Sequence, residues 1–319
     1  MTRRPEPRAP RALVWVDGAI VPAARARVSV HDRGFLYGEA FFETLRIRDG
    51  RLVLWRPHLR RLRASLDAFS IPRPAHDLER AAHALIAASG LREGALRVTV
   101  TGGVGEGLVR PAGLRPCVVM TLRALPAGLA RDVEHGISAV RLGFGRGLAR
   151  VDAGHKSVAY LGSIAGRRAA ARAGADDAIF VEADGRASEA TAGNLLIVRG
   201  RRLSTPPPAS GCLPGVTRAI LLRLARRAGL DVREEPLPAD SLARADEILV
   251  TGSVVEILSV VRLDGRPVGD GRPGPVAQRL RGALHSHVAR SLAAEARRDA
   301  SPPVGTGRAR RVGSRRARW

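Results

Sequence analysis

The sequence predicts a mixed α+β fold in two domains, one over residues 12–125 and one over 133–296, joined by a linker at 126–132. Three observations predict this fold class. The chain has 319 residues, of which 45% are hydrophobic, and this is enough for two cores. Its first half reads as hairpin strands followed by helices. Its second half alternates short apolar strands with helical spacing, and we find no internal repeat.

The elements of the first half follow from turn signals and apolar spacing. Asp17-Gly18 and Asp49-Gly50 each separate two apolar runs, as in a β-hairpin. Leu59, Leu62 and Leu66 recur at the spacing of one helix face. The strands are expected over 14–16, 20–21, 43–48, 51–55, 96–100 and 117–122, and the helices over 57–69 and 77–89.

Glycines mark the ends of the predicted helices in the second half. Gly174 and Gly229 each follow an apolar-periodic stretch, where a left-handed residue commonly ends a helix. Asp264-Gly265 indicates another hairpin, and the proline and glycine within 124–129 indicate the linker. The helices are expected over 158–173, 216–228 and 276–294, and the strands over 178–181, 194–198 and 247–251.

Composition excludes several classes of protein. The two cysteines, Cys117 and Cys212, have no CxxC spacing, so neither a disulfide framework nor a structural zinc site is expected. No apolar run approaches the roughly 18 residues of a membrane span. The apolar stretch 12–16 after the basic N-terminus is too short for a signal peptide. A soluble, cytoplasmic protein that does not contact the membrane is the expectation.

The net charge of +23 is carried partly by the two ends of the chain. Residues 1–11 form a basic extension, and 297–319 form an Arg-rich stretch that we expect to be a disordered tail. Such a tail could contact nucleic acid through phosphates. A nucleic-acid-binding protein of this kind would place stacking aromatics among the arginines, and the tail offers only Trp319. Nucleic-acid binding is therefore not favoured.

Lysine usage is the sharpest compositional feature. Of the 53 basic residues, Lys156 is the only lysine, because every other one is arginine. An exposed positive charge can be supplied by either residue, but only lysine offers a primary amine that can lose its proton and attack a carbonyl carbon. Lys156 is therefore the candidate catalytic residue.

Three further segments supply groups that suit a phosphorylated ligand. Glu189 stands among small residues in the stretch 187–194, which lets backbone approach a flat ligand closely. Thr217 opens a predicted helix, where unpaired amides attract an anion. The stretch 251–253 follows a strand and offers hydroxyls and exposed amides.

These segments occur in a recognisable order. The motifs are Asp32-Arg-Gly-Phe-Leu-Tyr37-Gly-Glu-Ala-Phe-Phe42-Glu-Thr44-Leu-Arg46, His58-Leu-Arg-Arg61-Leu62, Lys156-Ser157, the 189–194 stretch and Pro214-Gly-Val-Thr217-Arg218. Together they resemble the fold-type IV (class IV) pyridoxal-phosphate enzymes, which include branched-chain aminotransferases, D-amino-acid aminotransferases and aminodeoxychorismate lyases. The resemblance covers about residues 12–290. It implies an active site at the domain interface, pyridoxal 5′-phosphate as cofactor, and a homodimer.

The resemblance also implies roles for individual residues. Lys156 would form the Schiff base and then move protons, and Glu189 would keep the pyridine nitrogen protonated so that the ring accepts electrons. Tyr160 would hydrogen-bond the phenolic oxygen of the cofactor. The phosphate would be held by Arg61, Val216, Thr217 and Ser253.

The substrate side is less constrained by the sequence. The residues that the resemblance places there are Phe42, Arg46, Arg97, Gly252 and Val254. Alternation along the strand puts Arg97, Thr99 and Thr101 on one face, which could be the cleft side.

Two reactions stay open at this stage. Gly102 stands where D-amino-acid aminotransferases carry an arginine, which disfavours that subgroup. Arg46 and Arg97 match arginines of branched-chain enzymes, whereas Thr44 and the Gly-rich 101–107 loop resemble the lyases. The main hypothesis is an aminotransferase that uses a small, branched-chain amino acid and a 2-oxo acid such as 2-oxoglutarate. The alternative is 4-amino-4-deoxychorismate lyase, which releases pyruvate and 4-aminobenzoate. Substrate side chain and L or D preference stay open.

Overall fold

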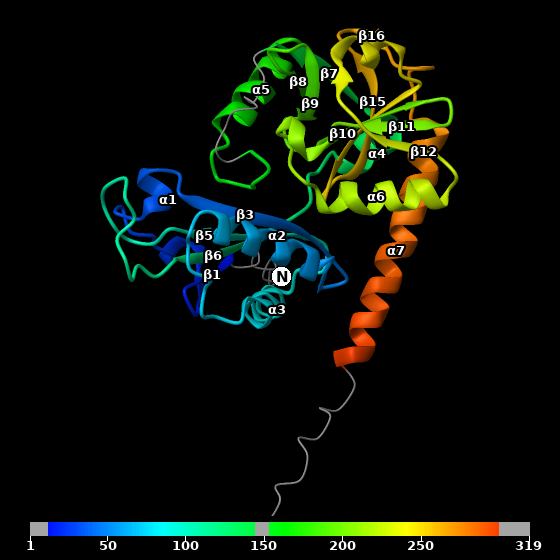
Figure 1. Ribbon diagram of the computed structural model, residues 1–319. Coiled ribbons are helices and arrows are strands. Elements are labelled where there is room, and N and C mark those ends of the chain that lie inside the picture. Colours follow the sequence, from blue (N-terminus) through cyan, green and yellow to red (C-terminus); the bar gives the residue numbers. More distant parts are fainter. Residues whose placement is uncertain (1–11, 144–152, 300–319) are drawn as a thin grey trace, which may run out of the picture.

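The computed structural model describes residues 12–143 and 153–299, and it contains two sheets (Figure 1). The first half of the chain forms a six-stranded antiparallel sheet in the order β2-β1-β6-β5-β3-β4. Its strands are β1 (Leu13–Val16), β2 (Ala19–Pro22), β3 (Ala40–Arg48), β4 (Arg51–Leu52), β5 (Gly94–Thr101) and β6 (Val118–Arg123). The Asp17-Gly18 and Asp49-Gly50 hairpins are confirmed, with both aspartates and both glycines at positive φ.

Two helices cover one face of this sheet (Figure 1). They are α2 (Trp55–Ala68) and α3 (Leu78–Ser89), and a short α1 (Arg33–Leu36) and the 3₁₀ turn η1 (Ala23–Arg25) precede β3. The spacing that predicted α2 is confirmed, because Leu62 and Leu66 are buried in the core beneath the sheet. The strand expected over 51–55 is wrong beyond Leu52, because Leu54 adopts a left-handed conformation with φ of 59° and the chain turns into α2.

The second half forms a ten-stranded mixed sheet in the order β12-β11-β10-β14-β15-β7-β8-β9-β13, with β16 beside β15. Its central strands are almost continuously apolar, as expected for a sheet covered on both faces. The strands are β7 (Ile137–Leu142), β8 (Asp177–Val181), β9 (Arg186–Ala190), β10 (Asn194–Arg199), β11 (Arg202–Thr205), β12 (Asp231–Glu234), β13 (Leu237–Pro238), β14 (Glu247–Gly252), β15 (Glu256–Leu263) and β16 (Arg266–Pro267).

An additional pairing closes the middle of this sheet on itself. Strand β9 pairs with β8 on one side and also with β10, through Glu189 and Asn194. Because β10 is linked to β8 through β14, β15 and β7, the pairing makes a closed ring of six strands. The helices around it are α4 (Leu129–His135), α5 (Leu161–Arg172), α6 (Val216–Arg227) and α7 (Pro275–Asp299), with 3₁₀ turns η2 (Pro208–Ser210) and η3 (Ala239–Arg244).

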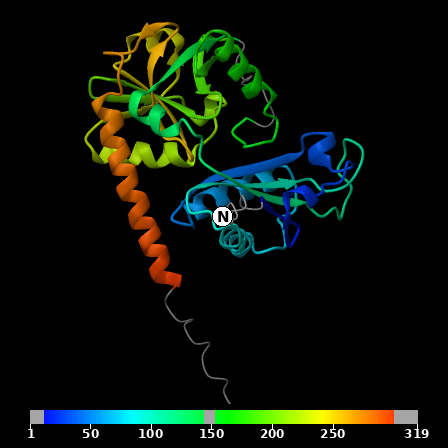
Figure 2. The ribbon, with the colours of Figure 1, turned by 180° about the vertical axis from the view of Figure 1, so that it is seen from behind.

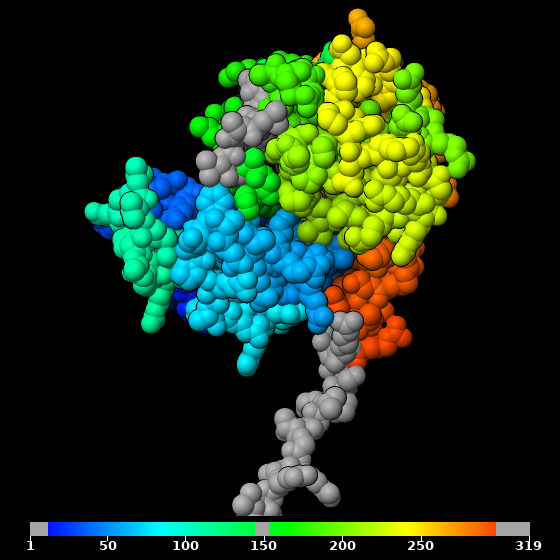
Figure 3. Space-filling view, viewed as in Figure 1, coloured from blue at the N-terminus to red at the C-terminus, as the bar shows by residue number. Residues whose placement is uncertain are grey.

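Helices α6 and α7 pack on each other and on β14, and α7 continues past the sheet toward the first half of the chain (Figures 1 and 2). The two halves meet along a shared boundary on the surface (Figure 3). No helix among the described residues is both long and apolar enough to cross a membrane.

Several other element boundaries differ from the sequence prediction. The helix expected from residue 158 begins at Leu161, because the residues before it pair with β3 through their backbone. The expected linker at 126–132 contains the first turn of α4. Helix α7 runs to Asp299, beyond the expected end at 294 and into the stretch taken for a tail. The basic extension 1–11 and residues 300–319 lie outside the described residues.

Candidate active site

A cavity of about 510 Å³ lies between the two halves of the chain and is lined by both of them. This volume is in the range of small-molecule sites. From the first half it is lined by residues of β3, β5, β6 and α2. All seven residues predicted to bind the cofactor line it, namely Arg61, Lys156, Tyr160, Glu189, Val216, Thr217 and Ser253.

Lys156 is positioned by strand β3 rather than by the helix that follows it. The Phe42 amide donates to the Lys156 carbonyl at 2.9 Å, and the Val158 amide donates to the Ala40 carbonyl at 3.0 Å. The lysine side chain therefore enters the cavity from a segment tied to the other half of the chain. Its Nζ donates to Tyr160 Oη at 3.0 Å and lies 4.7 Å from the Phe42 ring centroid.

Glu189 lies where the strand ring closes. It is 5% exposed, and its Oε2 accepts a hydrogen bond from the Leu213 amide at 3.2 Å. Its pairing partner Asn194 donates from Nδ2 to the Leu213 carbonyl at 2.7 Å. The carboxylate thus has a fixed place in the cavity wall. Gly193 is required beside it, because an added Cβ would lie 2.8 Å from the Thr251 carbonyl oxygen.

The N-terminus of α6 supplies a place for an anion in the same cavity. The helix begins at Val216 after Gly215, and no side chain caps its first amides. Unpaired amides and the helix dipole attract negative charge there. The buried Thr217 side chain lies in the first turn and also lines the cavity. Glycine is needed at 215, since a Cβ would overlap Asn194 Oδ1.

Arg61 is held in place by a buried carboxylate. Its Nε and Nη2 donate to the two oxygens of Glu43 at 2.8 and 2.7 Å, and its Nη1 donates to the Pro214 carbonyl at 3.0 Å. His58 Nδ1 lies 2.6 Å from the same carboxylate. Glu43 is 2% exposed and His58 is 1% exposed. A guanidinium has five N–H donors, so two remain for an anion in the cavity.

The electrostatics of this cluster follow from its burial. Burial opposes ionisation of Glu43, yet the hydrogen bonds and charges of Arg61 and His58 outweigh it and lower the pKa of Glu43 to about 2. Burial is also the largest influence on His58, and it lowers the pKa of that imidazole. The cluster is therefore a carboxylate paired with Arg61 and with a neutral imidazole at neutral pH.

The His58 imidazole links the Glu43 carboxylate to the hydroxyl of Ser253, which lines the cavity. His58 Nε2 lies 3.0 Å from Ser253 Oγ. With Nδ1–H donating to Glu43, a neutral His58 has Nε2 as an acceptor, so the hydrogen bond runs from the Ser253 hydroxyl to His58. Ser253 must turn from His58 before it can donate to an anion. Nearby, Thr251 Oγ1 is buried without a hydrogen-bond partner among the described residues, and it also lines the cavity.

Arg97 faces the cavity with its charge uncompensated by the protein. It is hydrogen-bonded to Thr99 Oγ1 at 3.2 Å, and its Cζ lies 3.4 Å from the Phe42 ring centroid. No carboxylate pairs with it in the part of the chain that the structure describes. Burial lowers its pKa, and Arg123 contributes in the same direction. A partly buried arginine without an anionic partner is suited to a ligand carboxylate.

Four of the five predicted substrate residues line the cavity, but Arg46 does not. Arg46 lies behind the wall, where its Nη1 donates to the Val254 carbonyl at 3.0 Å and its Nη2 donates to Glu93 at 3.3 Å. The expectation that the strand β5 alternation points three residues into the cleft is also only partly met. Arg97 lines the cavity, whereas Thr101 is buried and donates to Asp32 at 2.7 Å.

The sequence prediction did not assign roles to Glu43, Thr251 or Asn194. Glu43 stood inside a quoted motif, and a carboxylate within the apolar run 40–47 is a signal that it needs a buried partner. Thr251 lay in the stretch 251–253 that was noted for its hydroxyls. Asn194 gave no comparable signal, because its contacts depend on how the strand ring closes.

The donors of the cavity fit pyridoxal 5′-phosphate. An amine, a buried carboxylate and an uncapped helix N-terminus with an adjacent arginine line one space. These are the groups that an aldehyde, a ring nitrogen and a phosphate require. His155 also borders the cavity, where its Nδ1 lies 3.0 Å from Ser65 Oγ and its ring packs against Phe69.

Comparisons with known proteins identify the family. A sequence profile for amino-transferase class IV matches residues 40–263. A putative branched-chain-amino-acid aminotransferase of Methanocaldococcus jannaschii is 33% identical over 272 residues, which cover 84% of this chain and 93% of that protein. The crystal structure of the Escherichia coli branched-chain amino acid aminotransferase matches with a TM-score of 0.82 and 31% identity, covering 87% of this chain and 95% of that one.

The lyase subgroup is also similar in structure, at a lower level. A putative 4-amino-4-deoxychorismate lyase from Legionella pneumophila matches with a TM-score of 0.76 and 26% identity, covering 83% of this chain and 96% of that one. The profile match spans most of the chain, and the resemblance drawn from the motifs is confirmed. The chain is a member of the class IV aminotransferases, a family of two-domain, pyridoxal 5′-phosphate-dependent enzymes.

Proposed function

We propose that this enzyme transfers an amino group between a small, branched-chain amino acid and a 2-oxo acid such as 2-oxoglutarate. One observation carries the proposal: the Lys156 amine, the Glu189 carboxylate and the α6 N-terminus line a single cavity that also holds an unpaired arginine. The branched-chain aminotransferases among its relatives support the substrate class.

In this proposal Lys156 holds the cofactor covalently and then moves protons. Pyridoxal 5′-phosphate, when bound, supplies an electron sink that stabilises negative charge at the substrate Cα. The Lys156 amine, once free, would act as the base that takes the proton from the substrate Cα. The Tyr160 hydroxyl, 3.0 Å from Nζ, orients the amine. Glu189 keeps a proton on the ring nitrogen.

The phosphate would be held mainly from α6 and α2. The first amides of α6 and the Thr217 hydroxyl are free to donate, and Arg61 has two N–H groups left after those given to Glu43 and Pro214. Ser253 contributes less, because its hydroxyl first has to leave His58. We propose Thr217 and Arg61 as the principal side-chain contacts.

The substrate carboxylate would pair with Arg97. Phe42 lies against that guanidinium and also against the Tyr160 ring, with ring centroids 5.2 Å apart, so it fixes the position of both. Gly252 and Val254 border the same cavity and would contact the substrate side chain. Because Arg46 lies behind the wall, we propose that it supports the Val254 backbone rather than contacting the substrate.

We further propose a homodimer. Large apolar side chains are exposed on α1, on the loop after β5 and at the start of α5, including Phe35 at 74%, Leu108 at 87%, Val109 at 86% and Leu161 at 77%. Exposed apolar side chains of this size are common where two protein chains meet. The family architecture supports a second copy as the partner. Both cysteines are unpaired, in keeping with the cytoplasmic location that we propose.

The test begins with cofactor binding. The purified enzyme with added cofactor should absorb in the visible, and Lys156→Ala should lose that band. Leucine and 2-oxoglutarate should then give glutamate. The lyase alternative is favoured by Thr44 and by the Gly-rich loop, and Thr44 does line the cavity. Pyruvate release from aminodeoxychorismate, with no glutamate formed from any L- or D-amino acid, would overturn the aminotransferase proposal.

A further inference from the structure

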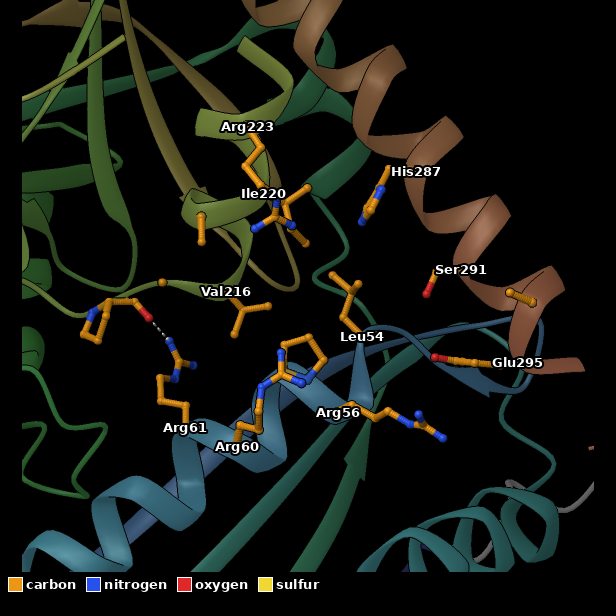
Figure 4. Close-up of a pocket in the computed structure, with 15 residues that line it drawn as sticks. Leu54, Arg56, Arg60, Arg61, Val216, Ile220, Arg223, His287, Ser291 and Glu295 are labelled. Atoms are coloured by element: carbon orange, nitrogen blue, oxygen red, sulfur yellow. Dashed lines mark hydrogen bonds between the residues drawn. The ribbon is translucent and has the colours of Figure 1, made fainter. Parts of the chain in front are cut away.

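A second cavity, of about 640 Å³, lies outside the proposed catalytic site, between α2, α6 and α7. Four arginines and a histidine line it, and its one carboxylate residue, Glu295, lies at its edge (Figure 4). Arg60 from α2, Arg223 from α6 and His287 from α7 point into it from three sides (Figure 4). Three elements from both halves of the chain therefore present basic groups to one space.

The two arginines have no anionic partner. Among residues 12–143 and 153–299, no ion pair or hydrogen bond involves the guanidinium of Arg60 or Arg223. Other arginines of the chain do have such partners, as Arg218 has in Glu234 at 3.0 Å and Arg48 has in Glu256 at 2.9 Å. Like charges that face each other across a space without a counter-ion repel, and an anion between them would relieve this.

The field in the cavity is positive. Burial lowers the pKa of His287, and the charges of Arg223, Arg290 and Arg227 lower it further. The apolar lining of the cavity includes Leu54, Pro57, Val216 and Ile220. Guanidiniums recognise phosphate oxygens in a bidentate manner, and apolar lining accommodates a hydrocarbon or aromatic body.

The cavity shares a wall with the proposed phosphate site. Arg61, Gly215 and Val216 border both spaces, and the Arg61–Pro214 hydrogen bond lies at their boundary (Figure 4). A ligand in this cavity would therefore contact Gly215 and Val216, which also border the first cavity. It would also connect α2 of the first half to α6 of the second.

We propose that this cavity is a binding site for a small organic phosphate with an apolar body, held by Arg60 and Arg223 and distinct from the cofactor site. Occupancy would bridge the two halves of the chain and stabilise the loaded enzyme. The proposal goes beyond the aminotransferase function and does not depend on the substrate of the reaction. The Arg-rich segment 300–319 has the wrong charge to fill the site.

Isothermal titration calorimetry on the cofactor-loaded enzyme, freed of excess cofactor and with full occupancy verified by absorbance, tests the proposal. The probes are phenyl phosphate, inorganic phosphate and phenol. We expect one phenyl phosphate per chain, inorganic phosphate binding at least fivefold more weakly, and no binding of phenol. Arg60→Ser or Arg223→Ser should weaken phenyl phosphate binding by about tenfold, the loss of one charge-assisted contact.

Arg172→Ser is the control, since Arg172 is an exposed arginine at the end of α5 that does not line the cavity. It should change the affinity less than twofold. Equal losses in Arg223→Ser and Arg172→Ser would mean that general surface charge attracts the probe, and the proposal would be wrong. Binding only to enzyme stripped of its cofactor would place the probe in the cofactor site and would equally overturn it. Both outcomes leave the aminotransferase assay unaffected.

Discussion

Replacement of Glu43 by glutamine tests the inference that a buried carboxylate positions the arginine of the phosphate site. The carboxylate accepts two hydrogen bonds from Arg61 and one from His58, at 2.6 to 2.8 Å. Glutamine keeps one acceptor oxygen but turns an NH₂ group toward one of these donors. Removing one partner of a buried ion pair costs about 3–5 kcal/mol. The variant should therefore unfold at lower temperature and release Arg61 from its fixed position.

The specific consequence concerns the phosphate of the cofactor. A charge-assisted hydrogen bond contributes about 1.5–3 kcal/mol, so the loss of one contact from Arg61 should raise the Kd for pyridoxal 5′-phosphate by roughly 10- to 150-fold. Pyridoxal has the same aldehyde and ring but no phosphate. The Kd for pyridoxal should change by less than threefold, because the substituted side chain does not contact Lys156 or Glu189.

The assay is a titration of the cofactor-free enzyme with each compound, followed by absorbance. Glu93→Gln is a suitable control, because that carboxylate also pairs with an arginine, Arg46, but is exposed and lies away from the cavity. The Kd for pyridoxal divided by the Kd for pyridoxal 5′-phosphate should fall in Glu43→Gln and stay constant in Glu93→Gln. If both compounds lose affinity equally in Glu43→Gln, the carboxylate serves only the stability of the fold and our reasoning is wrong.

Three further predictions concern single groups. Arg97→Gln should raise the KM for the amino acid by about 10- to 100-fold, measured by steady-state kinetics, and should leave the cofactor Kd unchanged in a titration. An unchanged KM would mean that Arg97 does not bind the substrate. Thr217→Val should raise the cofactor Kd about tenfold and leave pyridoxal binding intact, which the same titration checks. Burial in the folded state lowers the pKa of His58 below its ordinary value of 6.5, so the unfolded chain binds a proton there more readily. The free energy of unfolding should therefore be highest above pH 6.5 and should decrease as the pH falls below 6.5. Chemical denaturation at several pH values should show a flatter decline in His58→Asn, whereas substitution of the exposed His31 should leave the slope unchanged.

The sequence predicted the contents of the cavity better than their arrangement. The single lysine and the five motifs identified Lys156, Arg61, Glu189 and Thr217, because their chemistry is visible in residue type and order. What orients them was not visible. The carbonyl of Lys156 accepts from the Phe42 amide, and no local pattern near residue 156 indicates a partner more than a hundred residues away.

The helix boundaries show the same limit. The sequence favoured a helix from Val158, but the Val158 amide donates to the Ala40 carbonyl, and the helix begins only at Leu161. Tertiary hydrogen bonds outweighed a weak local preference. Arg46 lies outside the cavity for a related reason. Alternation along β3 places Arg46 on the same side as Phe42 and Thr44, but the cavity ends before it and the side chain meets Val254 instead.

Arg46 nevertheless has a role that its motif position did not reveal. Several of the contacts between the two halves of the chain are made by arginines of the first half, and these include Arg46 to Val254, Arg48 to Glu256 and Arg61 to Pro214. A guanidinium can satisfy a carbonyl or carboxylate across the boundary while remaining paired on its own side. Arg46 and Arg61 each do so, because Arg46 also donates to Glu93 and Arg61 also donates to Glu43. The planar fork of the guanidinium holds its donors in fixed directions, whereas the three donors of a lysine rotate about one nitrogen. At this boundary one arginine side chain therefore fixes the position of both halves of the chain at once.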